Sequence, residues 1–168
     1  RMAGELGTDD GVIRAWTANS RHRRDWALRT LHREVIARVA DPRIAVLGLA
    51  YKQDTASTKN SPSLALLADL GPFAVQVYDP VVPASAAAHP RALGAASALE
   101  ACRGADAVCL MTPWAEFRDL DPAALAAALR GRTVIDPYGL LDPGACVSAG
   151  LDHLALGEPP ARAAGRER

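Results

Sequence analysis

Apolar residues follow two different periods along this chain, and the change falls near residue 41. Before it, apolar positions recur at intervals of three and four, the spacing of one buried helical face. These positions are Leu28, Leu31, Val35 and Val39. After it, short apolar runs alternate with helical stretches, as in a parallel sheet that helices cover on both faces. The pattern predicts a helical segment over 1–41 and an α/β domain over 42–157.

Within the second part, we expect a Rossmann-like parallel sheet of about five strands with flanking helices. The expected strands are 43–48, 74–78, 106–111, 132–136 and, more weakly, 152–156. The expected helices are 62–70, 95–103 and 121–130. The alanine-rich run 84–96 is expected to be a loop or a weak helix. The proline- and arginine-containing tail, 158–168, is expected to be disordered.

Composition narrows the class of protein. The 168 residues are 49% hydrophobic and 23% charged, which is enough for one buried core. The formal net charge is zero, so neither nucleic acid nor an anionic membrane is an expected partner. No apolar run approaches the ~18 residues that span a bilayer. The three cysteines have no C-x-x-C spacing, which indicates a reducing, cytoplasmic setting rather than a disulfide framework.

The most distinctive polar segment follows the first expected strand. It reads G-L-A-Y-K-Q-D-T from Gly48 to Thr55, and Lys59-Asn60-Ser61-Pro62 comes shortly after. Ligands of open α/β sheets bind at the carboxyl ends of the strands, and Ser-Pro is a strong helix start whose N–H groups favour an anion. Because the loop lacks G-x-G-x-x-G, we expect an anion other than a dinucleotide pyrophosphate. The alternative is a solvated loop whose lysines pair with Asp54, and the spacing leaves both open.

Other polar and aromatic residues have two readings each. Asp79, which ends the second strand, caps the Asp79-Pro80 turn or binds a ribose, and we favour the cap. Trp114 and Phe117 are expected to pack a loop against the sheet rather than line a base pocket. Asp136 orients a ligand or caps a turn, with the ligand slightly favoured.

The basic cluster 21–24 is expected to be a solvated helix face or a dimer rim, because no aromatic residues interleave with it for stacking on nucleic acid. The four histidines have no metal-ligand spacing, so no metal site is expected.

Four motifs, in the same order, resemble the UDP-binding C-terminal domain of the UDP-glucose/GDP-mannose dehydrogenase family. The Gly48–Thr55 string with Ser61-Pro62 is similar to the family pattern G-x-x-[FY]-K-x-D-T followed by S-P. The other three are Tyr78-Asp79-Pro80, the segment 106–117 (A-D-A…T-x-W-x-E-F) and the segment 134–142 (V-x-D-x-R-N-x-x-D). Residues 8–33 resemble the end of the long central helix that joins the two domains of the family.

The resemblance implies an activity. Members of the family oxidise the C6 hydroxyl of a nucleotide-linked hexose, such as UDP-glucose, to a carboxylate with two NAD and a cysteine nucleophile. The C-terminal domain grips the nucleotide-sugar, and the central helix builds a homodimer. We therefore expect this chain to be the nucleotide-sugar-binding domain of an NAD-dependent UDP-glucose-type 6-dehydrogenase.

The resemblance also assigns site residues. Lys52 matches the lysine that contacts the sugar nucleotide, and Tyr51 matches the aromatic residue before it. Asp136 and Tyr138 fall in the D-x-R-N motif, where Tyr138 replaces the arginine and removes its positive charge. Lys59 replaces an arginine that helps to bind NAD, and it keeps the charge but loses the bidentate fork. These replacements indicate a diverged subfamily, with a different nucleotide or hexose as an open alternative.

The catalytic half of the family is missing from these 168 residues. There is no G-x-G-x-x-G fingerprint, and no cysteine lies in an F-G-G-x-C setting, so Cys102, Cys109 and Cys146 receive no catalytic role. We expect the chain alone to be inactive and, since it begins partway into a helical pattern, to be a piece of a longer protein. The alternative is a standalone non-catalytic module that binds a nucleotide or dimerises through its N-terminal helix.

Overall fold

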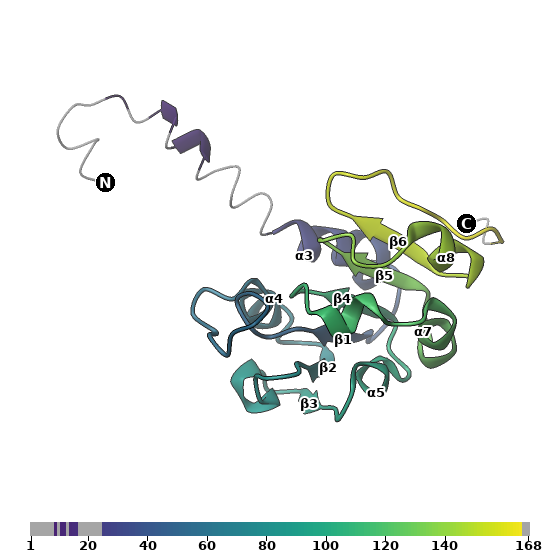
Figure 1. The fold of residues 1–168 in the computed structure, drawn as a ribbon, viewed down its shortest axis with the longest axis horizontal. Helices are drawn as coiled ribbons and strands as arrows, with labels where there is room; N and C mark the ends of the chain where they lie inside the picture. The colour runs from purple at the N-terminus through teal and green to yellow at the C-terminus, as the bar shows by residue number, and fades with distance from the viewer. Residues whose placement is uncertain (1–8, 10, 13, 17–24, 166–168) are drawn as a thin grey trace.

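A single parallel sheet of six strands organises the domain (Figure 1). A computed structural model describes residues 9, 11–12, 14–16 and 25–165. The strands are β1 (Arg43–Leu47), β2 (Ala74–Tyr78), β3 (Ala92–Gly94), β4 (Ala107–Leu110), β5 (Thr133–Asp136) and β6 (Asp152–Ala155). Their order is β3-β2-β1-β4-β5-β6, and every neighbouring pair is parallel. This is a Rossmann-like order, with its switch point between β1 and β4.

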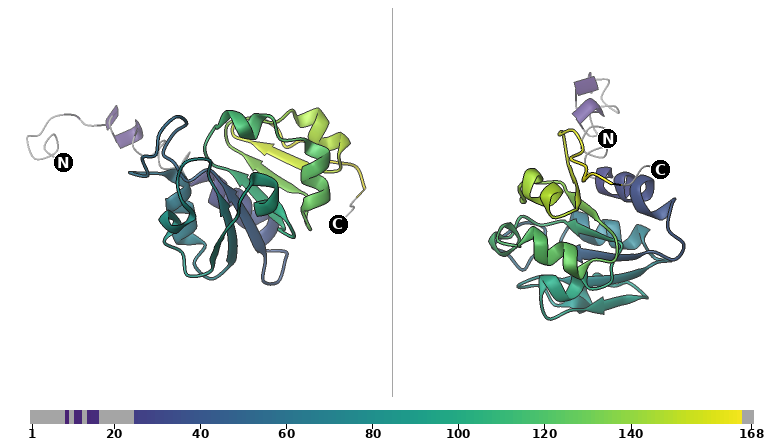
Figure 2. Two further views of the ribbon diagram at one scale, coloured as in Figure 1. Left: turned by 60° about the horizontal axis from the view of Figure 1, so that its bottom comes forward. Right: turned by 90° about the vertical axis from the view of Figure 1, so that its right-hand side faces the viewer.

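Helices cover both faces of the sheet (Figure 2). The helices and helical turns are α3 (Trp26–Leu31), the π-helical turn η1 (His32–Ile36), α4 (Pro62–Asp69), the 3₁₀ turn η2 (Ala84–Ala87), α5 (Ala98–Cys102), α6 (Ala115–Arg118), α7 (Pro122–Ala128) and α8 (Pro143–Ser148). Helix α3 packs against α4 on one face, while α5, α7 and α8 form a contacting row on the other. None of the helices within the described ranges is long and apolar enough to cross a membrane.

The central strands β1 and β4 carry the core. Residues 44–47 of β1 and all of β4 are fully buried, which explains their uninterrupted apolar sequences. On the face that α3 covers, Leu31 and Val35 of the predicted helical stripe belong to the same core. Residues 26–36 of the predicted helical segment therefore pack onto the α/β domain.

The fold class and the five expected strands are confirmed, but the expected strand count is one too low. The sixth strand, β3, lies in the alanine-rich run and pairs with β2 through only three residues. A strand of three residues without apolar alternation cannot be recognised from sequence, because it is set only by its pairing with β2. The predicted boundary between 1–41 and 42–157 stays a prediction, since residues 1–8, 10, 13 and 17–24 lie outside those that the structure describes.

The C-terminal segment differs from its prediction. Residues 158–165, expected to be disordered, run beside β6, where Ala161 and His153 form an antiparallel bridge with N···O distances of 2.8 and 3.0 Å. Ala163 is buried, and its N–H donates to Asp152 at 3.0 Å. We call residues 158–165 the C-terminal strap. It is ordered because it pairs with the otherwise open edge of β6, a contact that its own composition cannot reveal.

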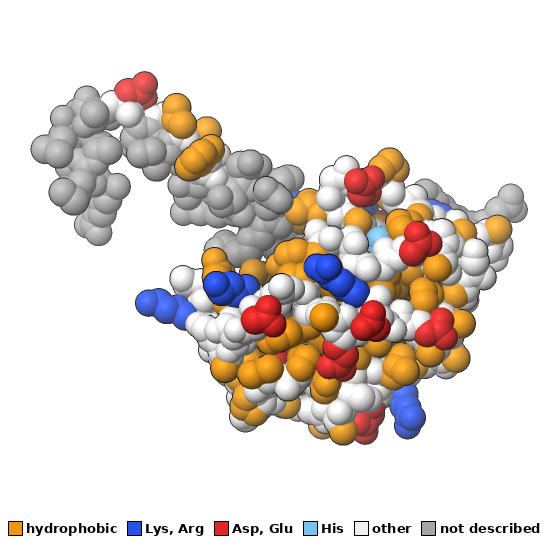
Figure 3. Space-filling model, in the orientation of Figure 1, with side chains coloured by type: hydrophobic (Ala, Val, Ile, Leu, Met, Phe, Trp, Pro, Cys, Tyr) orange, Lys and Arg blue, Asp and Glu red, His pale blue; other side chains and the backbone are white. Residues whose placement is uncertain are grey.

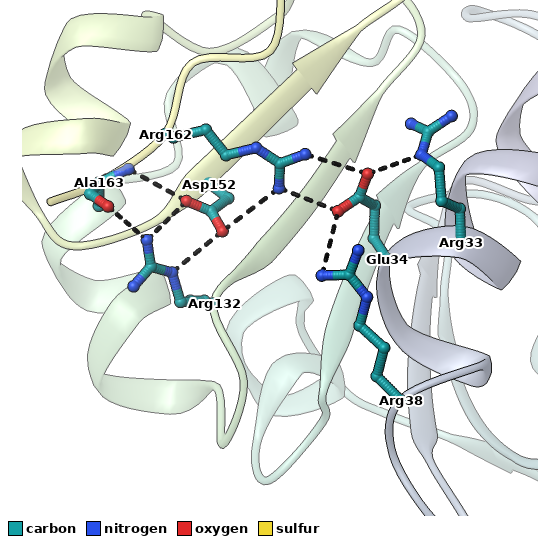
Figure 4. Close-up of polar contacts among 7 residues, drawn as sticks. All are labelled: Arg33, Glu34, Arg38, Arg132, Asp152, Arg162 and Ala163. Atoms are coloured by element: carbon teal, nitrogen blue, oxygen red, sulfur yellow. Dashed lines mark hydrogen bonds and ion pairs between the residues drawn. The ribbon is translucent and has the colours of Figure 1, made fainter. Parts of the chain in front are cut away.

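The strap connects η1 to the sheet through an ion network (Figure 4). Arg162 donates two hydrogen bonds to Glu34, at 2.9 and 3.0 Å, and Arg33 donates a third at 2.8 Å. Beside them, Arg132 binds Asp152 through two hydrogen bonds. The Arg162 hydrogen bonds outweigh the effect of burial and lower the pKa of Glu34 from 4.5 to about 2.

Glu34→Gln should destabilise the chain by about 1–3 kcal/mol at neutral pH, because a buried charged acceptor is lost. The pKa of Glu34 is lower in the folded state than its usual value of 4.5. Its contribution is therefore present above pH 4.5 and is lost as the pH falls from 4.5 towards 2. Urea denaturation over this range should show the gap between the parent and Glu34→Gln closing.

Glu158→Gln is the matched control, because this exposed glutamate lies in the same strap. It should leave the free energy of unfolding unchanged at every pH. A gap between the parent and Glu34→Gln that does not depend on pH would contradict the assignment.

Candidate functional site

The carboxyl ends of β1, β2, β4 and β5 meet at one edge of the sheet, and their loops form the candidate site. This edge brings together the segment 48–61, the turn after Asp79, the segment 111–114 and the loop 137–142. It includes the switch point between β1 and β4, which is the place where open α/β sheets bind ligands.

A single carboxylate, that of Asp79, holds three of these segments together. Its Oδ2 accepts hydrogen bonds from the N–H groups of Leu49 and Ala50, at 2.7 and 3.0 Å, and from the indole of Trp114 at 3.1 Å. Its Oδ1 accepts two more from Val81 and Val82, at 2.9 and 2.8 Å. The carboxylate thus joins the β1 loop, the β2 turn and the segment after β4.

The chemistry of Asp79 follows from these donors. Burial would raise its pKa, but the four backbone N–H groups together outweigh burial and lower it. The predicted turn-capping role of Asp79 is confirmed. Ribose binding is disfavoured, because both carboxylate oxygens already accept hydrogen bonds from protein donors. Trp114 and Phe117 are buried, so their predicted packing role is also confirmed.

The first glycine of the motif is needed for a close approach between two strands' ends. Gly48 has a φ of +93°, and a Cβ there would lie 2.5 Å from Cβ of Thr112. The Thr112 hydroxyl, in turn, donates to the carbonyl of Ala50 at 2.8 Å. A side chain at position 48 would force these segments apart, which explains why the loop begins with glycine.

Beyond Ala50 the loop projects from the sheet edge and presents its cations to solvent. The N–H of Tyr51 donates to the carbonyl of Ser57 at 2.7 Å, which closes the loop on itself. Lys52 and Lys59 are both exposed. Within the part of the chain that the structure describes, neither ammonium forms an ion pair with Asp54 or with any other carboxylate. The alternative of lysines paired with Asp54 is therefore not observed.

The loop ends at the predicted helix start, which is confirmed. Ser61 is the N-cap of α4, and its hydroxyl accepts from Leu64 N–H at 3.5 Å. The same hydroxyl donates to the carbonyl of Leu49 at 2.8 Å. The start of α4 is thereby fixed against the residues that Asp79 holds.

On the β4 side of the switch point, Asp136 ends β5 and comes directly before the loop 137–142. It is fully buried and accepts from Leu141 N–H at 3.0 Å and from Tyr138 N–H at 3.3 Å. His153 Nε2 lies 3.0 Å from its Oδ2. Within this structure Asp136 supports the loop from below, so the side chain open to a ligand is that of Tyr138 above it.

Tyr51 and Tyr138 come from different loops but lie close enough for the Tyr51 hydroxyl to affect the pKa of Tyr138. They are 50% and 48% exposed. Partial burial raises the pKa of Tyr138, and the nearby Tyr51 hydroxyl raises it further. The structure thus places two of the residues assigned by motif within electrostatic reach of each other, and about half of each residue is exposed to solvent.

Sequence reasoning missed His153 in this region. A single histidine in an apolar strand has no spacing signal, and its partner Asp136 is 17 residues away. Thr112 was also missed as the close partner of Gly48. Only the register of the neighbouring strands could have indicated these contacts.

Comparison with known proteins agrees with this architecture. Residues 45–143 match the sequence profile of the UDP-glucose/GDP-mannose dehydrogenase family, UDP binding domain. The chain belongs to this family. The match covers β1 to the start of α8, and so includes every loop of the candidate site.

The chain is also similar in sequence to individual dehydrogenases of the family. A UDP-glucose 6-dehydrogenase of Pseudomonas aeruginosa is 31% identical over 170 aligned positions, which cover 96% of this chain and 38% of that protein. UDP-glucose 6-dehydrogenase 2 of rice, Oryza sativa subsp. japonica, is 35% identical over 150 positions, which cover 68% of this chain and 31% of that protein. The chain thus spans less than half the length of these relatives.

Solved structures of the family share the fold. A UDP-D-ManNAc dehydrogenase from Pyrococcus horikoshii aligns with a TM-score of 0.73 at 25% identity, over 92% of this chain and 35% of that one. A UDP-glucose dehydrogenase from Pyrobaculum islandicum aligns with a TM-score of 0.68 at 22% identity, over 81% and 31%. The fold of this domain is therefore retained where the sequence has changed at most positions.

Asp79→Asn should destabilise this domain by about 3 kcal/mol, because the amide NH₂ turns a donor towards N–H groups that need an acceptor. Trp114→Phe removes the indole donor and part of a buried ring, and it should cost about 1–3 kcal/mol. Chemical denaturation would measure both free energies of unfolding.

Asp121→Asn is the matched control. Asp121 is an exposed N-cap that accepts one N–H, from Ala123 at 3.0 Å, and asparagine caps helices equally well. It should leave stability unchanged. Equal stability of Asp79→Asn and the parent would show that the five hydrogen bonds do not hold the edge together.

Proposed function

We propose that this chain binds the nucleotide-sugar of an NAD-dependent nucleotide-sugar 6-dehydrogenase, an enzyme that oxidises the sugar C6 hydroxyl to a carboxylate. UDP-glucose is the leading candidate for the ligand, since the matched profile is a UDP-binding domain and the relatives are UDP-glucose 6-dehydrogenases. The observation that carries the proposal is an exposed Lys52, which has no ion-pair partner among the described residues, at the same carboxyl edge of the sheet as the half-exposed Tyr51 and Tyr138.

Each of these side chains has a role that its chemistry supports. The Lys52 ammonium is a point charge suited to a phosphate, and no carboxylate of the described residues competes for it. Tyr51 and Tyr138 offer ring faces and hydroxyls to a base or a sugar. Asp136 acts beneath them by shaping the loop. The amino end of α4 adds a positive partial charge at the same edge.

NAD does not fit as a ligand held within this domain. The acidic residue that ends the second strand of a dinucleotide fold binds a ribose hydroxyl, but Asp79 already accepts five protein hydrogen bonds. Tyr138 and Lys52 are assigned to the sugar nucleotide, which leaves Lys59 as the proposed contact to an NAD held elsewhere. We therefore propose that the 168-residue chain alone does not catalyse oxidation.

The cysteines support the same conclusion. Cys102, Cys109 and Cys146 are all buried, and burial raises their pKa values to about 12, 12 and 11. A catalytic cysteine attacks as an accessible thiolate. These three thiols suit packing within the core.

The alternative is a non-catalytic module that binds a nucleotide or dimerises through its N-terminal helix. Trp16 is 76% exposed in that part of the chain, which suits a helix that packs against a partner. A homodimer is compatible with both the enzyme domain and the non-catalytic module. Nucleic acid is disfavoured as a partner, since acidic and basic side chains are interspersed on the face seen in Figure 3. Oxidation assays on the longest product of the gene separate enzyme from module.

Lys52→Ala should weaken UDP binding by about 1–3 kcal/mol, because one charge-assisted hydrogen bond to phosphate is lost. Titration of the chain with UDP, followed by amide NMR shifts of the loops 48–61 and 137–142, would measure the affinity. Lys52→Arg keeps the charge and should retain most of it.

Lys59→Ala is the matched control, because it removes the same charge from the same loop at a position assigned to NAD. It should change UDP affinity much less. Equal losses for the two variants would mean that the loop acts only through its net charge, and unchanged affinity in Lys52→Ala would remove this lysine from the site.

A further inference from the structure

A buried histidine–aspartate pair lies directly below the loop that carries Tyr138. His153 and Asp136 are 2% and 0% exposed, and Nε2 lies 3.0 Å from Oδ2. The two residues stand on neighbouring parallel strands, where His153 pairs in register with Val134, two positions before the aspartate. They therefore point to the same face of the sheet.

Asp136 also accepts hydrogen bonds from backbone N–H groups of the loop 137–142. Its Oδ1 accepts from Tyr138 N–H, near the start of the loop, and its Oδ2 accepts from Leu141 N–H, near the end. Gly139, with a φ of +63°, makes the turn between them. One carboxylate thus fixes both sides of a loop whose exposed member is Tyr138.

The histidine completes this arrangement as a donor. The carboxylate oxygens of Asp136 already accept from two backbone N–H groups, and in the tautomer with a proton on Nε2 the imidazole donates a third hydrogen bond to them. The histidine itself cannot shift easily, because its backbone N–H and C=O both pair with Ala161 of the C-terminal strap. The backbone from which the imidazole projects is therefore held from outside the site, and the imidazole contacts the carboxylate at 3.0 Å.

The Tyr138 side chain depends on this support. It has no side-chain hydrogen-bond partner among the described residues, so the path of its backbone decides where its ring lies. Without its side-chain hydrogen bond to His153, the one that the described residues supply, this buried carboxylate would be free to rotate, and the two N–H bonds to the loop would weaken with it.

We propose that His153 is a positioning residue for the nucleotide-sugar site. It orients Asp136, which holds the loop 137–142 and so places Tyr138 against the ligand. The part that concerns the ligand rests on the proposed function, while the part that concerns the loop stands on the contacts alone.

The test compares three variants of the chain. His153→Leu should disturb the amide NMR signals of Tyr138 and Leu141 without ligand, and should weaken UDP affinity about tenfold. His153→Gln, whose amide N–H reaches a similar position, should restore both. His89→Leu is the control, since its Nε2 contacts the carbonyl of Leu70 at 3.0 Å, away from this loop. It should leave the loop signals and the affinity unchanged.

A double-variant cycle separates positioning from general destabilisation. In a Tyr138→Ala background, His153→Leu should cause no further loss of UDP affinity, because the side chain through which it acts is gone. An additive loss would overturn the proposal. So would unchanged Tyr138 and Leu141 signals in ligand-free His153→Leu. If the parent chain shows no UDP binding while the loop signals respond as expected, the proposed function fails and the positioning of the loop stands.

Discussion

The buried carboxylate of Asp79 is the interaction on which the functional edge depends. Loops that leave a parallel sheet have no strand neighbour to take their first N–H groups, and buried N–H groups without acceptors are costly. Asp79 accepts four of them together with the indole of Trp114. This arrangement fixes the start of the loop 48–61, and the N-cap Ser61, bound to Leu49, fixes its end. The exposed lysines are therefore carried by a loop that is anchored at both sides.

Asp136 repeats this arrangement on the other side of the switch point between β1 and β4. Strands β2 and β5 flank the central pair β1 and β4, and each ends in an acid whose oxygens accept backbone N–H groups of the loops. The buried acids shape the edge, while the exposed cation and phenols above them, Lys52, Tyr51 and Tyr138, remain open to solvent. This separation explains how the proposed anion site can contain two acids without electrostatic conflict, because protein N–H groups donate to the carboxylates.

Features that depend on residues close together in the sequence could be predicted, and features that depend on contacts between distant residues could not. The central strands were predictable because burial on both faces leaves continuous apolar runs, and the start of α4 because Ser61-Pro62 is a local signal. The strand β3 and the C-terminal strap were not, because only pairing with distant residues defines them. The same holds within the site. Lys52 and Tyr51 stand in a local motif, whereas the contact of His153 with Asp136 depends on strand register.

The chain has zero net charge, but its ion pairs are not spread evenly over the two edges of the sheet. At the amino edge of the sheet, arginines meet carboxylates in bidentate pairs, as Arg132 meets Asp152. At the carboxyl edge, Lys52 has no such partner among the described residues. A local anion site is therefore compatible with a neutral protein, because net charge governs long-range attraction and unpaired charge governs local binding. The C-terminal strap connects the two edges physically: Arg162 ties it to Glu34, and its bridge to His153 holds the histidine that supports the Tyr138 loop.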